Sequence, residues 1–201
     1  MEITAQMVKE LRQATAAGIL DCRKALESAD GDFDKAVDYL REKGLAKAAK
    51  RMGRDAKDGL VDAYIHAGGR IGVLIEVNCE TDFVARTQEY KDLVSGLAMQ
   101  VAAMNPHFLT REDVPESVLE HERGLYRAQA LQEGKPENIV GRIVDGRMEK
   151  FFKEACLMEQ DYIRDEEKTV DDLVKEQINK TGENIVVRRF ARFELGENLG
   201  E

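Results

Sequence analysis

Cysteine is scarce in this chain, and its spacing excludes two kinds of site. The 201 residues include three cysteines that lie far apart: Cys22, Cys79 and Cys156. No two of them form a C-x-x-C pair, so neither a zinc site nor a dithiol redox motif is expected. We expect three reduced thiols, mostly buried as small apolar side chains.

Histidine is equally rare, and the motifs that hold metals or nucleotides are missing. No two histidines lie four residues apart, so the sequence contains no helical His-x-x-x-His metal motif. All three are expected at the surface: His66, His107 and His121. Neither a G-x-x-x-x-G-K-[ST] loop nor a G-x-G-x-x-G loop occurs, so no phosphate-binding loop for a nucleotide is predicted.

Long apolar runs are also lacking. No run approaches the roughly 18 residues that a membrane-crossing helix needs. The first ten residues, M-E-I-T-A-Q-M-V-K-E, are amphipathic and do not contain the basic and apolar regions of a secretory signal. The expected location is therefore the cytoplasm.

Carboxylates are plentiful, but no arrangement of side chains predicts a reaction. The run Asp165-Glu166-Glu167 has no histidine, cysteine or serine beside it, so it identifies no nucleophile or general base. We expect this run to be a solvated turn. The sequence predicts no catalytic residue, no metal site and no cofactor, and a small-molecule enzyme is retained only as an alternative.

The charge balance disfavours a protein that coats nucleic acid. The formal net charge is -9, whereas phosphate binding needs clustered cations. One cationic cluster does occur in residues 45–59, which we expect to be a partly helical linker: Lys47, Lys50, Arg51, Arg54 and Lys57. It is either a solvated connector or a basic patch for an acidic partner surface. A nucleic-acid or ribosome-associated module that uses this patch is a second alternative.

Residues 1–44 are expected to form a bundle of three short helices. Apolar residues recur at helical spacing in residues 7–14 and again in residues 20–29. Asp32 is a good N-cap for the third helix, and Gly44 is expected to end it. A core of this size should be only marginally stable by itself.

From Leu60 the apolar period changes from helical to alternating. Residues 60–65 and 71–77 alternate on either side of Gly68-Gly69, which predicts an antiparallel hairpin. Further helices are expected from Thr81 to Asn105, on both sides of Gly134-Lys135-Pro136, and from Thr169 to Gly182. Residues 184–195, N-I-V-V-R-R-F-A-R-F-E-L, are typical of a strand.

These elements predict an α+β fold. Residues 1–44 would form a three-helix partner-binding domain, residues 45–59 a basic linker, and residues 60–201 an α+β core. In that core the hairpin and the C-terminal strand make a small antiparallel sheet with helices packed on one side. Such a sheet has exposed edges or an uncovered face, which invites a symmetric partner.

The junction after the hairpin, V-N-C-E-T-D-F-V-A-R at residues 77–86, places Asp82 beside Phe83. Thr81 is expected to cap the next helix, with Asp82 in the first turn, where negative charge suits the helix dipole. Taken alone, the residues favour a capped helix whose first core aromatic is Phe83. The alternative is that the carboxylate and the ring project toward another molecule.

Three segments of the chain resemble bacterial elongation factor Ts. They are T-A-A-G-I-L-D-C-R-K-A-L at residues 15–26, V-N-C-E-T-D-F-V-A-R at residues 77–86, and G-E-N-I-V-V-R-R-F-A-R-F-E at residues 182–194. Their order agrees with the family, and the resemblance to its short form covers almost the whole chain. It implies that the N-terminal bundle is of the ubiquitin-associated-like type. It also implies a guanine nucleotide exchange factor that stimulates GDP release from elongation factor Tu and so recycles that GTPase for translation.

The resemblance also implies roles for particular residues. One segment would displace Mg²⁺ in the partner: Thr81, Asp82, Phe83 and Val84. The N-terminal bundle would contact the partner's G domain through four candidates: Arg12, Ile19, Leu20 and Arg23. For Ile19 and Leu20, the residues alone favour a place in the bundle core.

Partners follow from the same resemblance. Elongation factor Tu would be bound in its GDP-bound and nucleotide-free states. Short members of the family suggest a homodimer, with residues 60–201 as the dimerisation domain. No direct contact with nucleic acid or membrane is implied.

Overall fold

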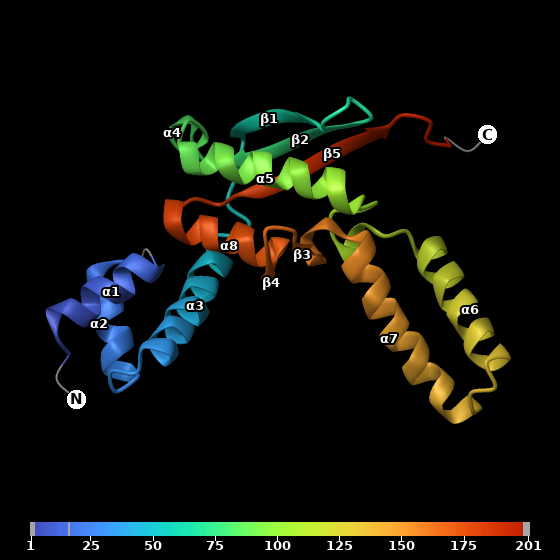
Figure 1. Cartoon of the computed structure of the whole chain (residues 1–201), viewed down its shortest axis with the longest axis horizontal. Coiled ribbons are helices and arrows are strands. Elements are labelled where there is room, and N and C mark those ends of the chain that lie inside the picture. Colours follow the sequence, from blue (N-terminus) through green and yellow to red (C-terminus); the bar gives the residue numbers. More distant parts are fainter. Residues whose placement is uncertain (1–2, 16, 199–201) are drawn as a thin grey trace. The chain divides into compact units, whose positions relative to one another are not determined.

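The structure, a computed structural model, describes residues 3–15 and 17–198 (Figure 1). This part of the chain contains helices α1–α8 and strands β1–β5, which confirms the α+β class. It divides into two compact units. Of the described residues, unit 1 comprises 3–15, 17–59, 78–90 and 174–186, and unit 2 comprises 60–77, 91–173 and 187–198.

The predicted division of the chain at residues 44 and 59 stays a prediction. The outermost residues of the predicted first and last domains, 1–2 and 199–201, lie outside the described residues. Within the described ranges, no helix is both long enough and apolar enough to cross a membrane.

Unit 1 begins with the predicted three-helix bundle. Helices α1 (Ala5–Thr15), α2 (Ile19–Ser28) and α3 (Phe33–Ala49) enclose a small core of six buried residues: Leu11, Cys22, Ala25, Leu26, Ala36 and Leu40. The Asp32 carboxylate accepts a hydrogen bond from the Lys35 N–H at 3.1 Å, which confirms the predicted N-cap.

Gly44 does not end the third helix, so that prediction is wrong. Helix α3 continues through the predicted linker boundary to Ala49. Gly44 is buried, and a Cβ at this position would lie 3.1 Å from Nδ2 of Asn179. The glycine therefore allows a close approach of α8 (Val170–Thr181) to α3, and it is tolerated in the helix because that packing compensates for its low helix propensity.

The three-stranded sheet has the order β1-β2-β5. Strands β1 (Asp58–Ile65) and β2 (Ile71–Cys79) form the predicted hairpin, and β5 (Val186–Glu194) is the predicted C-terminal strand. Later residues of β5 lie beside earlier residues of β2, since Leu195 N–H donates to Arg70 O at 2.8 Å and Arg189 pairs with Glu76 at 2.7 Å. The two strands are therefore antiparallel, as predicted.

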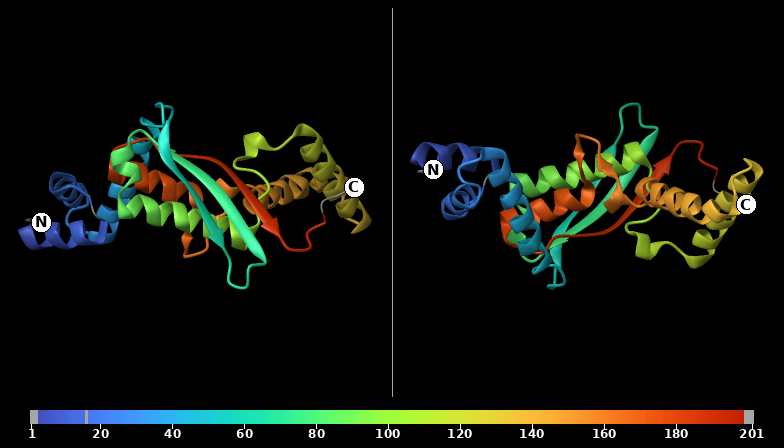
Figure 2. Two further views of the ribbon diagram at one scale, coloured as in Figure 1. Left: turned by 90° about the horizontal axis from the view of Figure 1, so that it is seen from above. Right: turned by 90° about the horizontal axis from the view of Figure 1, so that it is seen from below.

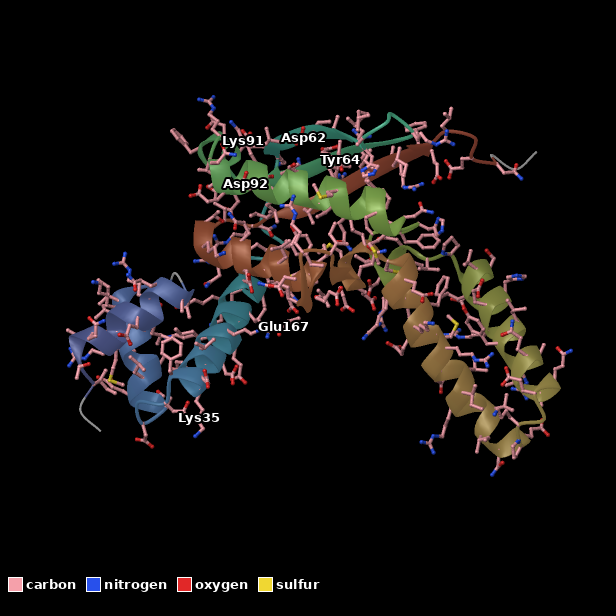
Figure 3. The ribbon with its side chains drawn as sticks, viewed as in Figure 1. Lys35, Asp62, Tyr64, Lys91, Asp92 and Glu167 are labelled. Atoms are coloured by element: carbon pink, nitrogen blue, oxygen red, sulfur yellow. The ribbon has the colours of Figure 1, made fainter. Side chains whose placement is uncertain are left out.

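Helix α5 (Gln88–Met104) covers one face of the sheet (Figure 1). The side chains of Val73 and Ile75 on β2 are buried, as are Leu97 and Val101 on α5. On β1 the residues between the apolar positions are polar: Figure 3 labels Asp62 and Tyr64 there, together with Lys91 and Asp92 of α5. Val61, Ala63 and Ile65 alternate with these two β1 residues and are exposed, so they belong to the face that α5 does not cover.

Unit 2 also contains a long helical hairpin. Helices α6 (Glu116–Gln132) and α7 (Glu137–Ala155) are joined by a turn in which Gly134 has φ of +72°. A small cluster of buried residues lies at its base: Val114, Met148, Phe152 and Cys156. Two 3-10 turns flank the hairpin, at Arg111–Asp113 and Leu157–Glu159.

A second, two-stranded sheet was not predicted. Strand β3 (Asp161–Tyr162) pairs with β4 (Asp165–Thr169), so the carboxylate run expected to be a turn is a strand. The buried Gln100 side chain binds the backbone on both sides of Tyr162: it donates to Asp161 O and accepts from Ile163 N–H, and it also donates to the side chain of Gln160. These contacts are tertiary, which explains why local pattern did not reveal the strands.

Gly124 offers a test of how helix propensity acts in α6. A Cβ at Gly124 would meet nothing within 4 Å. Gly124→Ala should therefore stabilise α6 by roughly 0.5–1 kcal/mol, since alanine is the better helix former. Slower amide hydrogen exchange in α6 would report this gain. Gly134→Ala is the matched control: it meets equally open space, but its positive φ should make the change destabilising. Faster exchange in the Gly124 variant would contradict the prediction.

Candidate functional site

The candidate site lies where β2 ends and a one-turn helix begins. Helix α4 spans Asp82–Ala85, and α5 starts separately at Gln88, so the single helix predicted from Thr81 to Asn105 is wrong. Thr87 makes the break: its hydroxyl donates to Val84 O at 2.8 Å and accepts from Tyr90 N–H at 3.3 Å. Asp82 and Phe83 therefore stand on a short turn with its own orientation.

Phe83 is exposed and is not the first core aromatic. Its relative exposure is 79%, whereas Ala85 in the same turn is buried and Val84 is half-buried. The interpretation favoured by the residues alone is therefore wrong for Phe83. The ring projects from the surface. The protein therefore lacks the stabilisation of about 1.5–3 kcal/mol that burying a phenylalanine side chain would provide.

Asp82 projects from the same turn with its charge partly compensated. Its carboxylate pairs with Arg86 at 2.7 Å, one helical turn away, and both side chains remain substantially solvent-accessible. Exposed pairs of this kind contribute at most about 1 kcal/mol. The pair can therefore open at little cost when another charged group approaches.

Thr81 occupies the predicted N-cap position, but its hydroxyl does not cap the helix. Instead the hydroxyl donates to Oε1 of Glu183 at 2.6 Å. The backbone N–H groups of Glu80 and Thr81 both donate to Oε2 of the same carboxylate, at 3.1 and 3.0 Å. Sequence reasoning missed Glu183, because it lies between the predicted helix and the predicted strand and nothing local connects it to a residue 102 positions earlier.

Two buried side chains, the Cys79 thiol and the Tyr90 phenol, lie next to the turn. The Cys79 thiol donates to Thr81 O at 3.2 Å, and it hydrogen-bonds with the hydroxyl of fully buried Tyr90. Burial raises the pKa of both groups above their ordinary values, so both are neutral near pH 7. All three cysteines are free and buried, which confirms that prediction, and burial raises the pKa of Cys156 to about 11.

The N-terminal candidates are all exposed on the bundle. Ile19 and Leu20, in the first turn of α2, have relative exposures of 57% and 76%. The expectation from the residues alone, that they lie in the bundle core, is therefore wrong. Arg12 on α1 is exposed, and Arg23 on α2 pairs with Glu27 at 3.2 Å. The structure thus brings an apolar pair and two cations to the outside of α1 and α2.

Asp21 ties the first turn of α2 to α3. Its two carboxylate oxygens accept from Lys43 and Lys47, each at 2.9 Å. These hydrogen bonds, that of Lys43 first, lower the pKa of Asp21 to about 2. Ile19 and Leu20 are therefore held out from a turn that is anchored on its other side.

The cations of residues 45–59 are mostly engaged within the chain. Lys47 pairs with Asp21, Arg54 lies 3.5 Å from Glu80, and Lys57 pairs with Asp55. The Arg51 guanidinium donates to Ile178 O at 3.1 Å. Carboxylates beside Lys47, Arg54 and Lys57 lower the local positive charge, and together with the net charge of -9 this disfavours the nucleic-acid alternative.

Among the described residues, the histidines form no metal site. All three histidines are exposed, as predicted: His66, His107 and His121. Within residues 3–15 and 17–198, no group of three or more histidine, cysteine or acidic side chains is arranged to hold a metal ion. What the site presents is an exposed ring and a carboxylate on a turn that two other segments of the chain fix in place.

Comparison with known proteins gives one consistent result. The family model described as "Elongation factor TS" matches residues 2–197. An elongation factor Ts from Thermoanaerobacter sp. is 66% identical over 197 residues, which cover 98% of this chain and 97% of the relative. Relatives of the same name from Moorella thermoacetica and Carboxydothermus hydrogenoformans are 61% and 60% identical, and the matches cover 97% and 92% of their lengths and 98% and 99% of this chain.

Proposed function

Because the chain belongs to the elongation factor Ts family, the nucleotide exchange factors of elongation factor Tu in translation, we propose that it promotes GDP release by disturbing the Mg²⁺ and phosphate site of that GTPase. It would bind elongation factor Tu·GDP, stabilise the nucleotide-free state, and leave the GTPase ready for GTP and aminoacyl-tRNA. The exchange makes and breaks no covalent bond, so the chain would act without being an enzyme. We place this activity in the cytoplasm.

The observation that carries the proposal is the exposure of Phe83 on an anchored turn. Phe83 is 79% exposed, although on one side of it Thr81 makes two hydrogen bonds to Glu183 and Glu80 makes a third, and on the other side Ala85 is buried. A stiff base lets an exposed ring push into a partner instead of folding back onto its own chain. The adjacent Asp82 adds a carboxylate that can compete for the waters and side chains around a Mg²⁺ ion, which keeps several waters in such sites.

Release of GDP follows from differential binding. A protein that binds the nucleotide-free GTPase more tightly than the GDP complex must weaken GDP binding by the same factor. Each tenfold loss of GDP affinity needs about 1.4 kcal/mol of such preference. Losses of several powers of ten therefore need a broad contact surface besides Asp82 and Phe83. Thr81 and Val84 would serve by holding the turn, since Thr81 is bonded to Glu183 and Val84 is half-buried.

The proposal is tested by measuring release of labelled GDP from purified elongation factor Tu. Catalytic amounts of this protein should accelerate release, and excess unlabelled GDP should prevent rebinding during the measurement. A release rate that does not change with added protein would overturn the proposal. The same assay with the Mg²⁺ concentration varied separates disturbance of the metal from disturbance of the phosphates alone.

We propose that the N-terminal bundle makes the affinity-determining contact with the G domain. Ile19 and Leu20 form an exposed apolar pair one helical turn from Arg23, and Arg12 is exposed on α1; apolar and arginine side chains of this kind are typical of an interface hot spot. Leu20→Ala should raise KM for elongation factor Tu·GDP about thirtyfold, since hot-spot truncations cost ~2 kcal/mol, and should leave kcat unchanged.

A matched control for this prediction is Leu125→Ala, which removes an exposed leucine from α6. Its KM should equal that of the unmodified protein. If Leu20→Ala lowered kcat and left KM unchanged, the bundle would be part of the release step and not the affinity contact.

We also propose a homodimer formed through the open face of the sheet. This face is defined by Val61, Ile65, Leu74 and Phe193, whose exposures are 62%, 66%, 50% and 71%. A groove on this open face is lined by residues of β1, β2 and β5. In the left view of Figure 2 these three strands lie in front of α5. A contiguous apolar surface of this kind favours a partner, and a symmetric contact would let each copy cover the other.

A further inference from the structure

We infer that Glu183 is a positioning residue for the exchange reaction: its carboxylate holds the turn that presents Asp82 and Phe83. The inference rests on the proposed function, because it concerns the same segment. It adds a residue from the other end of the chain, at the junction between α8 and β5. Glu183 itself needs no contact with the GTPase.

The Glu183 carboxylate is a three-fold acceptor. Oε1 accepts from the Thr81 hydroxyl at 2.6 Å, and Oε2 accepts from the N–H groups of Glu80 and Thr81 at 3.1 and 3.0 Å. Hydrogen bonds to an ionised carboxylate are shorter and about twice as strong as neutral ones. Three of them on one group fix both the position and the direction of the backbone that enters α4.

A second carboxylate makes the reciprocal contact. Oε1 of Glu80 accepts from Asn184 N–H at 2.6 Å and lies 3.5 Å from the Arg54 guanidinium. Asn184 is 2% exposed, and its side-chain amide donates to Arg54 O at 2.8 Å. The Glu183 carboxylate thus binds the backbone of residues 80 and 81, and the Glu80 carboxylate binds the backbone of residue 184. Together the two carboxylates act as a clamp between these segments.

The turn needs such a clamp because it cannot hold its own shape. Helix α4 has four residues, far below the roughly 12–15 that an isolated helix needs to be stable in water. Phe83, being exposed, adds no packing of its own, and the Asp82–Arg86 pair lies at the surface. Thr87 and buried Ala85 hold the end of the turn, so its start, at residues 80 and 81, is the part whose direction depends on the Glu183 carboxylate.

The chain at Glu183 is arranged to bring the carboxylate to that point. Gly182, with φ of +81°, ends α8 in a backbone conformation that other residues rarely adopt. The Thr181 hydroxyl then accepts from Glu183 N–H at 3.3 Å. Glu183 consequently leaves the helix with its N–H bonded and its carboxylate directed at the β2–α4 junction.

The test is Glu183→Gln, which keeps the size of the side chain and removes its charge and one acceptor oxygen. We expect kcat for GDP release to fall about tenfold, since misplacing a reacting group by as little as 1 Å can cost up to about a hundredfold. KM for elongation factor Tu·GDP should change less than about twofold, because the N-terminal contact is intact. Glu167→Gln, an exposed glutamate on β4, is the matched control and should change neither value (Figure 3).

A double-variant comparison separates positioning from general stability. In a chain that already carries Asp82→Ala and Phe83→Ala, Glu183→Gln should cause no further loss of kcat, because nothing remains to be positioned. Thermal unfolding should shift equally in both backgrounds. Glu183→Asp, which retains the charge but not the reach, should recover part of the rate.

The outcomes are distinct. Unchanged kcat in Glu183→Gln, or an equal loss in the Asp82/Phe83 background, would overturn the inference while leaving the exchange function intact. A wild-type protein that does not accelerate GDP release would overturn the proposed function itself.

Discussion

Replacing Asp82 and Phe83 together by alanine is expected to lower kcat for GDP release about a hundredfold, since a loss of about 1.4 kcal/mol at each position gives tenfold apiece. KM should rise less than about threefold. The reason is that both side chains project from an anchored turn, with Phe83 79% exposed, and act on the nucleotide site rather than holding the complex together. Stopped-flow release of labelled GDP, with elongation factor Tu·GDP varied, yields both constants.

The chain contains a matched control for this pair. Phe33 and Asp34 also stand side by side in the first turn of a helix, and Phe33 is 39% exposed. Phe33→Ala with Asp34→Ala should leave kcat unchanged. If the Asp82/Phe83 variant lost affinity as strongly as rate, the pair would be an anchor for the complex and not the element that expels GDP.

Charging the open face of the sheet should abolish the homodimer. Leu74→Glu with Phe193→Glu would place four carboxylates in a symmetric interface, two from each copy. Each buried, unpaired charge costs several kcal/mol, so the dimer dissociation constant should rise more than about a hundredfold. Both positions are at least half exposed in the single chain, so its fold should survive.

Sedimentation equilibrium at several concentrations measures this effect. The unmodified protein should sediment as a dimer and the charged variant as a monomer, while Leu125→Glu on α6 should remain a dimer. A variant that still dimerises would show that another surface is used. An unmodified protein that is monomeric at every concentration would refute the dimer itself.

The helices and strands followed largely from local pattern. Of the helix predicted from Thr81 to Asn105 the C-terminal end is right, since α5 ends at Met104. The hairpin at residues 60–77 and the helix between Thr169 and Gly182 occur as predicted. Thr169 caps the last of these, its hydroxyl accepting from Asp172 N–H at 3.1 Å. Periodicity and capping act within a few residues, so the sequence states them directly.

The errors occurred where a distant segment outweighs a local preference. Gly44 looked like a helix end, but close packing against Asn179 allows α3 to continue. The acidic run Asp165-Glu166-Glu167 looked like a solvated turn, but pairing with β3 makes it a strand. The first outcome depends on a neighbour more than one hundred residues away, and the second depends on pairing with another strand. Local sequence pattern describes neither.

The candidate site shows the same division. The sequence alone located the strand end at Cys79, the helix start after Thr81 and the adjacent acid and ring; it also determined, through its resemblance to a family, which GTPase the chain acts on. Only the tertiary structure decided that Phe83 is exposed, that Thr81 bonds to Glu183, and that Ile19 and Leu20 lie outside the bundle core. The physical reason is that burial and long-range hydrogen bonds depend on which segments meet. Here the antiparallel sheet brings the end of β2 beside the start of β5, and residues 81 and 183 meet only there.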